Sequence, residues 1–360
     1  MRSEALSRLL AETGFAAAER APLVGDASTR RYERLILPDR RAMLMDAPPT
    51  QESPPCPPGA TPDERRTMGW NATARLAASR VEAFVAVAAH LKALGLAPPD
   101  IYGADLSAGY AVIEDLGDSL YAQILPQGAD EVALYEEAAR LLAHVHAAPL
   151  PTRLDGPGGA SWPLLDYDAL ALEVNADLFV EWLPRAADVR IDDAARARWE
   201  KVRDGLIVKA LGFPRAFTIR DYHAENLLWL PEREGLRRVG LLDFQDAVRG
   251  WRAWDFAMLL HDARRDVSGA AAAAAIGAYL RATGASEAEF RRELAVLGAI
   301  NAMRILGIFS RLAGRDGKQR YLGFMPREWG HLARALEHPA LEDARAFVES
   351  VARPYLERAA

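Results

Sequence analysis

The chain has a single cysteine, Cys56, among its 360 residues. One thiol cannot form an internal disulfide, so the sequence predicts a fold without disulfides in a reducing, cytoplasmic compartment. An excess of basic residues is also missing, because 44 lysines and arginines stand against 50 acidic residues and give a net charge of −6. Binding to nucleic acid through phosphate contacts needs the opposite balance, so no nucleic-acid partner is expected.

Long uncharged apolar runs are absent as well. A membrane-spanning helix needs roughly 18 to 20 such residues, and the nearest candidate, the alanine run at 270–275, is much shorter. The opening segment MRSEALSRLLAETGF has charges spread through an amphipathic helical pattern and lacks the apolar centre of a signal peptide. We therefore expect no membrane partner and no secretory leader, and no pattern indicates an obligate protein partner.

The pattern of the sequence changes near residue 117. Before it, alternating segments at 31–37, 42–45 and 110–113 predict a small antiparallel sheet, and 81–94 predicts a helix. The Pro-rich, charged segment 48–68 predicts an exposed loop or a partly ordered insertion. Beyond residue 117, apolar residues recur at helical spacing in 131–147, 170–183, 194–211, 255–265, 270–282, 287–312 and 341–356. The fold class expected is α+β, with a sheet-containing lobe at 1–117 and a mostly helical lobe at 118–360.

Two β-like runs, 216–219 and 238–242, interrupt the helical part and are expected to form a short hairpin. The first runs into Asp221, and Asn226 follows five residues later, which is the D-x-x-x-x-N spacing of a kinase catalytic loop. Phosphoryl transfer needs a carboxylate to orient and accept the proton of the attacking hydroxyl, and oxygen ligands for magnesium. Asp and Asn are also common in turns, so the spacing alone leaves a plain turn open.

A second acidic motif, LLDFQDA, places Asp243 at the end of the other β-like run, 22 residues after Asp221. Kinases carry their second magnesium ligand on such an Asp-Phe pair. A strand-terminal Asp can also cap the next turn, but two motifs in this order together favour a kinase.

The runs RDYHAENLLW, LLDFQDA and WDFAMLLHDA resemble the aminoglycoside phosphotransferase superfamily of small-molecule kinases. Within it, GDASTRRYERL, MLMDAPP and VIEDLGDSLY are similar to the anomeric sugar kinases, which phosphorylate the C1 hydroxyl of N-acetylmuramate and N-acetylglucosamine in peptidoglycan recycling. The resemblance extends from about residue 20 to 310. It implies a bilobal protein-kinase-like fold, ATP and Mg²⁺ as cofactors, and a small amino sugar as substrate.

The resemblance also implies roles for individual residues. Asp221 would be the catalytic base, and Asn226 and Asp243 would bind Mg²⁺. The ATP-binding residues would be Gly25, Asp26, Ala27, Ser28, Thr29 and Arg30 over the phosphates, with Glu114 and Leu116 at the adenine. Supporting positions would be Asp246 and Asp255. The acceptor pocket would draw on Glu173, Asn175, Glu181, Arg249 and Arg304. Simpler interpretations stay open: a hairpin turn at 25–29, a helix cap at Asp255, and an ordinary amphipathic helix around Glu173.

The sequence departs from kinases in two positions. In the catalytic loop, Ile219 replaces the usual histidine two residues before Asp221, and activity should survive this change. The third strand usually carries a lysine that holds the ATP phosphates, but here it reads AMLMD. Arg30, Arg31 or Arg41 could supply the positive charge, and Glu82 could pair with it or belong to a capping box. The alternatives to a sugar kinase are a kinase of an aminoglycoside, choline or another amino alcohol, and a pseudokinase scaffold without turnover.

Overall fold

The computed structural model describes residues 2–23, 30–48, 57, 59–68 and 80–359. Its contacts divide the chain into two compact units. The first comprises 1–130, 148–165 and 219–249, and the second comprises 131–147, 166–218 and 250–360. The predicted phosphate-covering residues 25–29 lie outside the described residues. Residues 219–249, which contain Asp221 and Asp243, belong by their contacts to the same unit as the sheet. The predicted lobe boundary near 117 stays a prediction.

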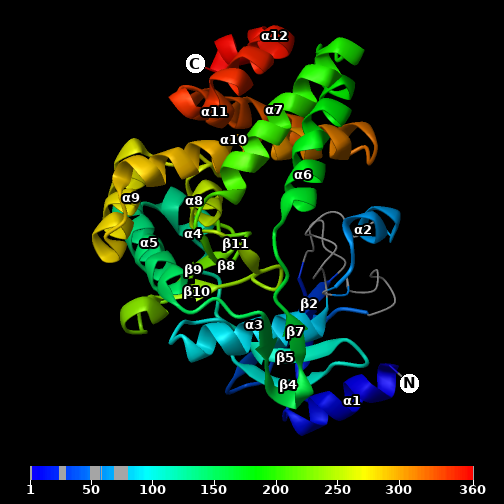
Figure 1. Cartoon of the computed structure of the whole chain (residues 1–360). Coiled ribbons are helices and arrows are strands. Elements are labelled where there is room, and N and C mark those ends of the chain that lie inside the picture. Colours follow the sequence, from blue (N-terminus) through cyan, green and yellow to red (C-terminus); the bar gives the residue numbers. More distant parts are fainter. Residues whose placement is uncertain (1, 24–29, 49–56, 58, 69–79, 360) are drawn as a thin grey trace. The chain divides into compact units, whose positions relative to one another are not determined.

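A five-stranded antiparallel sheet forms the centre of the first unit, in the order β1-β2-β3-β5-β4. Strands β2, β4 and β5 are labelled in Figure 1. Its strands are β1 (Glu19–Pro22), β2 (Arg31–Ile36), β3 (Arg41–Asp46), β4 (Ile101–Asp105) and β5 (Tyr110–Glu114). Leu35, Leu44 and Val112 are buried in one apolar cluster with Leu9 and Leu10. The last two belong to helix α1 (Arg2–Glu12), so the predicted N-terminal amphipathic helix covers one face of the sheet.

Three further helices are found among the described residues of the first unit: α2 (Pro62–Met68), α3 (Val81–Ala93) and the short α4 (Tyr121–Ile124). The helix predicted over 81–94 is α3, and the residue at its N-cap is Arg80. Helix α2 lies inside the segment predicted as an exposed loop or a partly ordered insertion. A capping box starts it, because Glu64 accepts hydrogen bonds from the Thr61 backbone and hydroxyl, both at 2.8 Å, and Thr61 Oγ1 accepts from Glu64 N at 3.3 Å.

Eight helices described in the second unit are α5 (Glu131–Ala147), α6 (Ala169–Trp182), α7 (Asp193–Leu211), α8 (Arg252–Leu260), α9 (Gly269–Thr283), α10 (Glu287–Gly314), α11 (Met325–Leu336) and α12 (Glu342–Ala359). Helix α10 packs against α6, α8 and α11. By length and composition it could cross a membrane, but 83% of its most apolar stretch is buried inside the protein, which makes it the core helix of this unit. Ser286 caps it, accepting from Glu289 N at 3.4 Å.

Short strand pairs flank the two acidic motifs. Strand β8 (Arg215–Thr218) pairs with β11 (Val248–Trp251), β9 (Leu227–Trp229) pairs with β10 (Val239–Leu241), and β6 (Arg153–Asp155) pairs with β7 (Ser161–Pro163). The predicted hairpin between the runs at 216–219 and 238–242 is therefore wrong, because each run pairs with a strand that the sequence did not reveal. Strands of three or four residues are too short to show a reliable alternation.

Candidate active site

The loop from Asp221 to Asn226 is held by hydrogen bonds within the first unit. Asn226 N donates to His223 O at 2.8 Å and closes a turn. The Asn226 side chain folds back, and its Nδ2 donates to Asp221 O at 2.8 Å. Leu242 N donates to Asn226 O at 2.9 Å, which joins this loop to the residue before Asp243. The structure thus brings the predicted base and both predicted metal ligands into one hydrogen-bonded region.

Backbone strain marks the same region. Among the described residues other than glycine, the two with positive φ are Arg220 (82°) and Asp243 (54°). A side chain in this left-handed conformation costs roughly 1–2 kcal/mol, and such strain concentrates at functional sites. One strained residue directly precedes Asp221 and the other is Asp243 itself. Both carboxylates are therefore directed by backbone conformations that the surrounding structure must enforce.

Arg220 connects Asp221 with the supporting carboxylate, Asp246. Its guanidinium Nη2 lies 3.6 Å from Asp221 Oδ2 and 4.0 Å from Asp246 Oδ2. Burial, together with the nearby charges of Asp221 and Asp243, raises the pKa of Asp246 to about 6, against the opposing effect of Arg220. Asp246 thus shares the Arg220 cation with Asp221, and its supporting role stays a prediction.

Asp243 is anchored through its neighbour Phe244 and through one oxygen of its carboxylate. Phe244 is fully buried and stacks on Phe84 of α3, with ring centroids 4.9 Å apart. Asp243 Oδ1 accepts from Gln245 Nε2 at 2.9 Å and forms an ion pair with Arg30. Burial alone would raise the pKa of Asp243, but Arg30, Gln245 and His223 together lower it below its ordinary value. Asp243 is therefore kept ionised, as a metal ligand must be.

The free oxygens of this region fit Mg²⁺. Among the described residues, neither Asn226 Oδ1 nor Asp243 Oδ2 takes part in a hydrogen bond or an ion pair. Within those same residues, no cluster of three His, Cys, Asp or Glu side chains is arranged to hold a metal. Mg²⁺ is usually held by one or two protein oxygens together with substrate phosphates and waters. One amide and one carboxylate oxygen are thus an adequate protein contribution.

The predicted adenine-binding segment follows β5 and is tied to neighbours in the first unit. Glu114 Oε1 forms an ion pair with Arg233 at 2.5 Å, and Asp115 Oδ2 pairs with Arg34 at 2.7 Å. Leu116 lies beside Gly240 of β10, since a Cβ built on that glycine would be 3.3 Å from Leu116 Cδ1. The segment is therefore linked to the β9–β10 pair, and its contact with adenine stays a prediction.

The predicted acceptor residues are divided between the two units, with Arg249 in the first and the other four in the second. Arg249 Nη1 donates to Pro151 O at 3.4 Å. Asn175 is buried on α6, and its Nδ2 donates to Tyr167 OH at 2.9 Å and to Ala171 O at 2.8 Å. Arg304 Nη1 on α10 donates to Asn301 Oδ1 at 3.0 Å. Glu173 is half-buried on α6, and Glu181, near the end of that helix, is exposed.

Asp255 is fully buried inside the first turn of α8. The helix-cap alternative is therefore wrong, since α8 begins at Arg252 and its N-cap is Trp251. The Asp255 carboxylate lies 3.3 Å from His146 Nε2, and His146 Nδ1 lies 3.1 Å from Tyr279 OH. Sequence reasoning missed this chain of contacts, because 109 residues separate His146 from Asp255.

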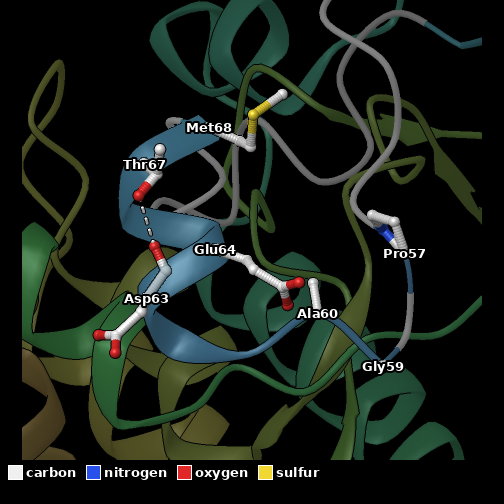
Figure 2. Close-up of a pocket in the computed structure, with 7 residues that line it drawn as sticks. All are labelled: Pro57, Gly59, Ala60, Asp63, Glu64, Thr67 and Met68. Atoms are coloured by element: carbon white, nitrogen blue, oxygen red, sulfur yellow. Dashed lines mark hydrogen bonds between the residues drawn. The ribbon is translucent and has the colours of Figure 1, made fainter.

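A pocket of about 620 Å³ lies at α2, away in sequence from all of these residues (Figure 2). Its lining residues are Pro57, Gly59, Ala60, Asp63, Glu64, Thr67 and Met68. Thr67 Oγ1 donates to Asp63 O at 2.9 Å, which is the contact drawn in the figure. None of the predicted site residues lines this pocket, so size alone does not indicate the active site here.

The grouping of Asp221, Asn226 and Asp243 is the arrangement expected of a phosphotransferase. The chain belongs to the phosphotransferase enzyme family, whose model matches residues 19–293. It is 50% identical to an N-acetylmuramate/N-acetylglucosamine kinase of Caulobacter vibrioides, over 97% of this chain and 96% of that protein. It is 34% identical to a kinase of the same name from Pseudomonas aeruginosa, over 89% of this chain and 84% of that protein.

Solved structures confirm the predicted fold class. A choline/ethanolamine kinase family protein from Mesorhizobium loti matches with a TM-score of 0.58 and 16% identity, covering 97% of this chain and all of that one. The chain is thus a kinase with the α+β, protein-kinase-like fold that the sequence predicted. At such low identity, this likeness establishes the fold alone.

Proposed function

We propose that this chain transfers the γ-phosphoryl group of ATP to the anomeric hydroxyl of N-acetylmuramate or N-acetylglucosamine, in peptidoglycan recycling in the cytoplasm. The products are the sugar 1-phosphate and ADP. The main support is the 50% identity, over nearly the whole chain, to a kinase named for these two sugars. The small-molecule substrate requires no nucleic acid, membrane or obligate protein partner.

The residues of the candidate site suit this reaction. Among the described residues, the Asp221 carboxylate forms one loose ion pair, with Arg220 at 3.6 Å, so it can orient a hydroxyl and accept its proton. Asn226 and Asp243 would hold Mg²⁺, which supplies charge stabilisation for the transferring phosphoryl group. Arg220 and Asp246 keep the base in place. An anomeric hydroxyl is more acidic than other sugar hydroxyls, so Asp221 need not be a strong base.

The remaining assignments follow from the family resemblance. Residues 25–29 and Arg30 would cover the phosphates, and Glu114 and Leu116 would lie at the adenine. Asp255 would support the catalytic loop from its place in α8. Acceptor contacts would come from Glu173, Asn175, Glu181, Arg249 and Arg304. The positively charged Arg249 and Arg304 suit N-acetylmuramate, because the lactyl group of this sugar carries a carboxylate.

The test is ADP production with a panel of N-acetylmuramate, N-acetylglucosamine, their methyl glycosides, choline and aminoglycosides. The free N-acetyl sugars should turn over, and the methyl glycosides, in which C1 is blocked, should be inert. Phosphorus NMR of the product should show an ester on the anomeric carbon. A sugar 6-phosphate, or a preference for choline or an aminoglycoside, would contradict this function, and no turnover with any acceptor would favour a pseudokinase.

A further inference from the structure

The three arginines that could replace the third-strand lysine differ sharply in their surroundings. Arg31 and Arg41 are exposed, and neither forms an ion pair with any described residue. Arg31 begins β2, while Arg41 lies opposite Ile36 at the far end of the β2–β3 ladder. Arg30 has a side chain only 9% exposed, and it forms an ion pair with Asp243. A guanidinium withdrawn from water in this way needs a compensating negative partner.

The Arg30 side chain is directed toward the third strand. Its Nη1 donates to Tyr32 OH at 3.3 Å, and Tyr32 OH donates in turn to Met45 Sδ at 3.5 Å. Tyr32 and Met45 are direct partners in the β2–β3 ladder. Met45 lies on β3, the strand that reads AMLMD where kinases have their lysine. The charged side chain therefore comes from the residue before β2, and Tyr32 links its guanidinium to Met45 of β3.

Arg30 contacts one carboxylate oxygen of Asp243, Oδ1, and does not contact the other, Oδ2. Its guanidinium and Gln245 Nε2 both bind Oδ1, while Oδ2 has no partner among the described residues. Glu82, the residue considered as a partner for the replacement cation, forms no ion pair within the described part of the chain. Arg30 is thus paired with the predicted metal ligand itself, unlike a lysine that pairs with a glutamate of the next helix.

We propose that Arg30 replaces the missing third-strand lysine: it orients Asp243 through Oδ1 so that Oδ2 can bind Mg²⁺, and it supplies fixed positive charge at the ATP phosphates. This assignment rests on the proposed kinase function. It differs from the usual arrangement because the cation comes from the start of the second strand. An arginine suits this position, since its planar guanidinium stays charged when buried and can bind two acceptors at once.

The test measures nucleotide binding in the absence of any sugar. Isothermal titration with ATP, at a series of Mg²⁺ concentrations and in EDTA, is performed on the wild type, R30Q, R30K and the matched control R31Q. R30Q should weaken MgATP binding by about 10- to 100-fold, the range for residues that orient metal ligands. It should also raise the Mg²⁺ concentration needed for half-saturation. The MgATP affinity of R30K should lie between those of the wild type and R30Q, and the affinity of R31Q should stay within about twofold of the wild type.

A double-mutant cycle separates positioning from a general structural effect. If Arg30 acts through Asp243, the effects of R30Q and D243N on MgATP binding should be strongly non-additive. A merely structural Arg30 would lower thermal stability without shifting the Mg²⁺ midpoint. MgATP binding by R30Q within twofold of the wild type, or an unchanged Mg²⁺ midpoint, would overturn the proposal. Because no sugar is present, these outcomes do not depend on which acceptor the enzyme uses.

Discussion

The Asp221 side chain has few partners for a residue that is only 19% exposed. Its contact with Arg220, at 3.6 Å, is longer than a hydrogen bond, whereas its backbone oxygen is firmly bound by Asn226 at 2.8 Å. The backbone is thus held in place while the carboxylate stays available. This is the arrangement expected for a base that must receive a hydroxyl proton rather than stabilise the fold.

Replacing Asp221 by Asn should separate catalysis from binding. D221N keeps the size of the side chain but cannot accept a proton, so kcat should fall by about 10² to 10⁴-fold. Nucleotide binding and thermal stability should stay near the wild-type values, which calorimetry and a melting curve would check. A D221N enzyme that keeps more than about a tenth of the wild-type kcat would remove Asp221 from this role.

Replacing Asp243 by Asn tests the metal site. D243N retains an oxygen acceptor for Arg30 and Gln245 but loses the charge that attracts Mg²⁺. We expect kcat to drop by more than about 10²-fold and MgATP binding to weaken about tenfold or more, with little change in ATP binding in EDTA. Equal weakening with and without Mg²⁺ would instead indicate that Asp243 only supports the loop.

At the scale of elements, close packing positions α6 against α10. A Cβ added at Gly307 of α10 would overlap the backbone carbonyl of Leu178 on α6. Backbone atoms cannot rotate away, so the two helices must separate to accept a larger residue. Asn175 and Arg304, two predicted acceptor residues, lie on these same two helices. Their relative placement in the second unit thus depends on the glycine.

The variant G307A should therefore destabilise the protein by about 1–3 kcal/mol, as overpacking does. Gly205 in the middle of α7 is a matched control, since a Cβ there would meet nothing within 4 Å. G205A should stabilise by about 0.5–1 kcal/mol, because alanine loses less backbone freedom in a helix than glycine. Urea unfolding would measure both. A neutral G307A would mean that α6 and α10 can shift apart without cost.

The sequence predicted helices better than strand partners, for a physical reason. Helical spacing is local, so the helix predicted at 131–147 is found with the same limits, and the helix predicted over 287–312 is found as α10. Helix α11 was not predicted, although Met325, Trp329 and Leu332 recur at helical spacing and a proline stands in its first turn. The pairings β8–β11 and β9–β10 depend on distant residues, and no local pattern shows them.

The residues of the candidate site also differ in this way: some belong to local motifs, and others depend on contacts between distant residues. The acids Asp221 and Asp243 and the amide of Asn226 were predicted from motifs because their spacing is short. Arg30 was one of three equivalent candidates, since its partner Asp243 is 213 residues away and only the folded chain brings them together. The strain at Arg220 was not predictable, because the sequence contains no glycine there to signal a positive φ.

At the scale of the whole molecule, several buried titratable groups prefer their neutral forms. Burial lowers the pKa of His261 to about 3 and that of His331 to about 4, and the two rings stack with centroids 5.0 Å apart. Burial raises the pKa of Glu328 on α11 well above its ordinary value, and the charge of Asp262 adds to the effect. Both Glu328 carboxylate oxygens are buried and lack a hydrogen-bond partner within the described residues. The histidines weaken the folded protein in acid, and Glu328 weakens it at neutral pH.

Replacing Glu328 by Gln should therefore stabilise the protein by an amount that grows with pH. Near pH 4 the carboxyl is protonated in both folded and unfolded chains, and E328Q should differ little from the wild type. Above about pH 4.5, the unfolded chain releases the proton while the folded one keeps it, so the wild type loses about 1.4 kcal/mol of stability for each pH unit until the folded carboxyl ionises. E328Q escapes this loss. The histidines titrate in both proteins, so their effect on stability cancels in the comparison.

Urea midpoints at pH 4, 5, 6 and 7 would show the divergence. The exposed Glu337 is the control, since E337Q should change stability by less than about 0.5 kcal/mol. A difference between E328Q and the wild type that stays constant over this range would mean that Glu328 is ionised in the folded protein, held by the positive charges of Arg304, Arg327 and Arg264.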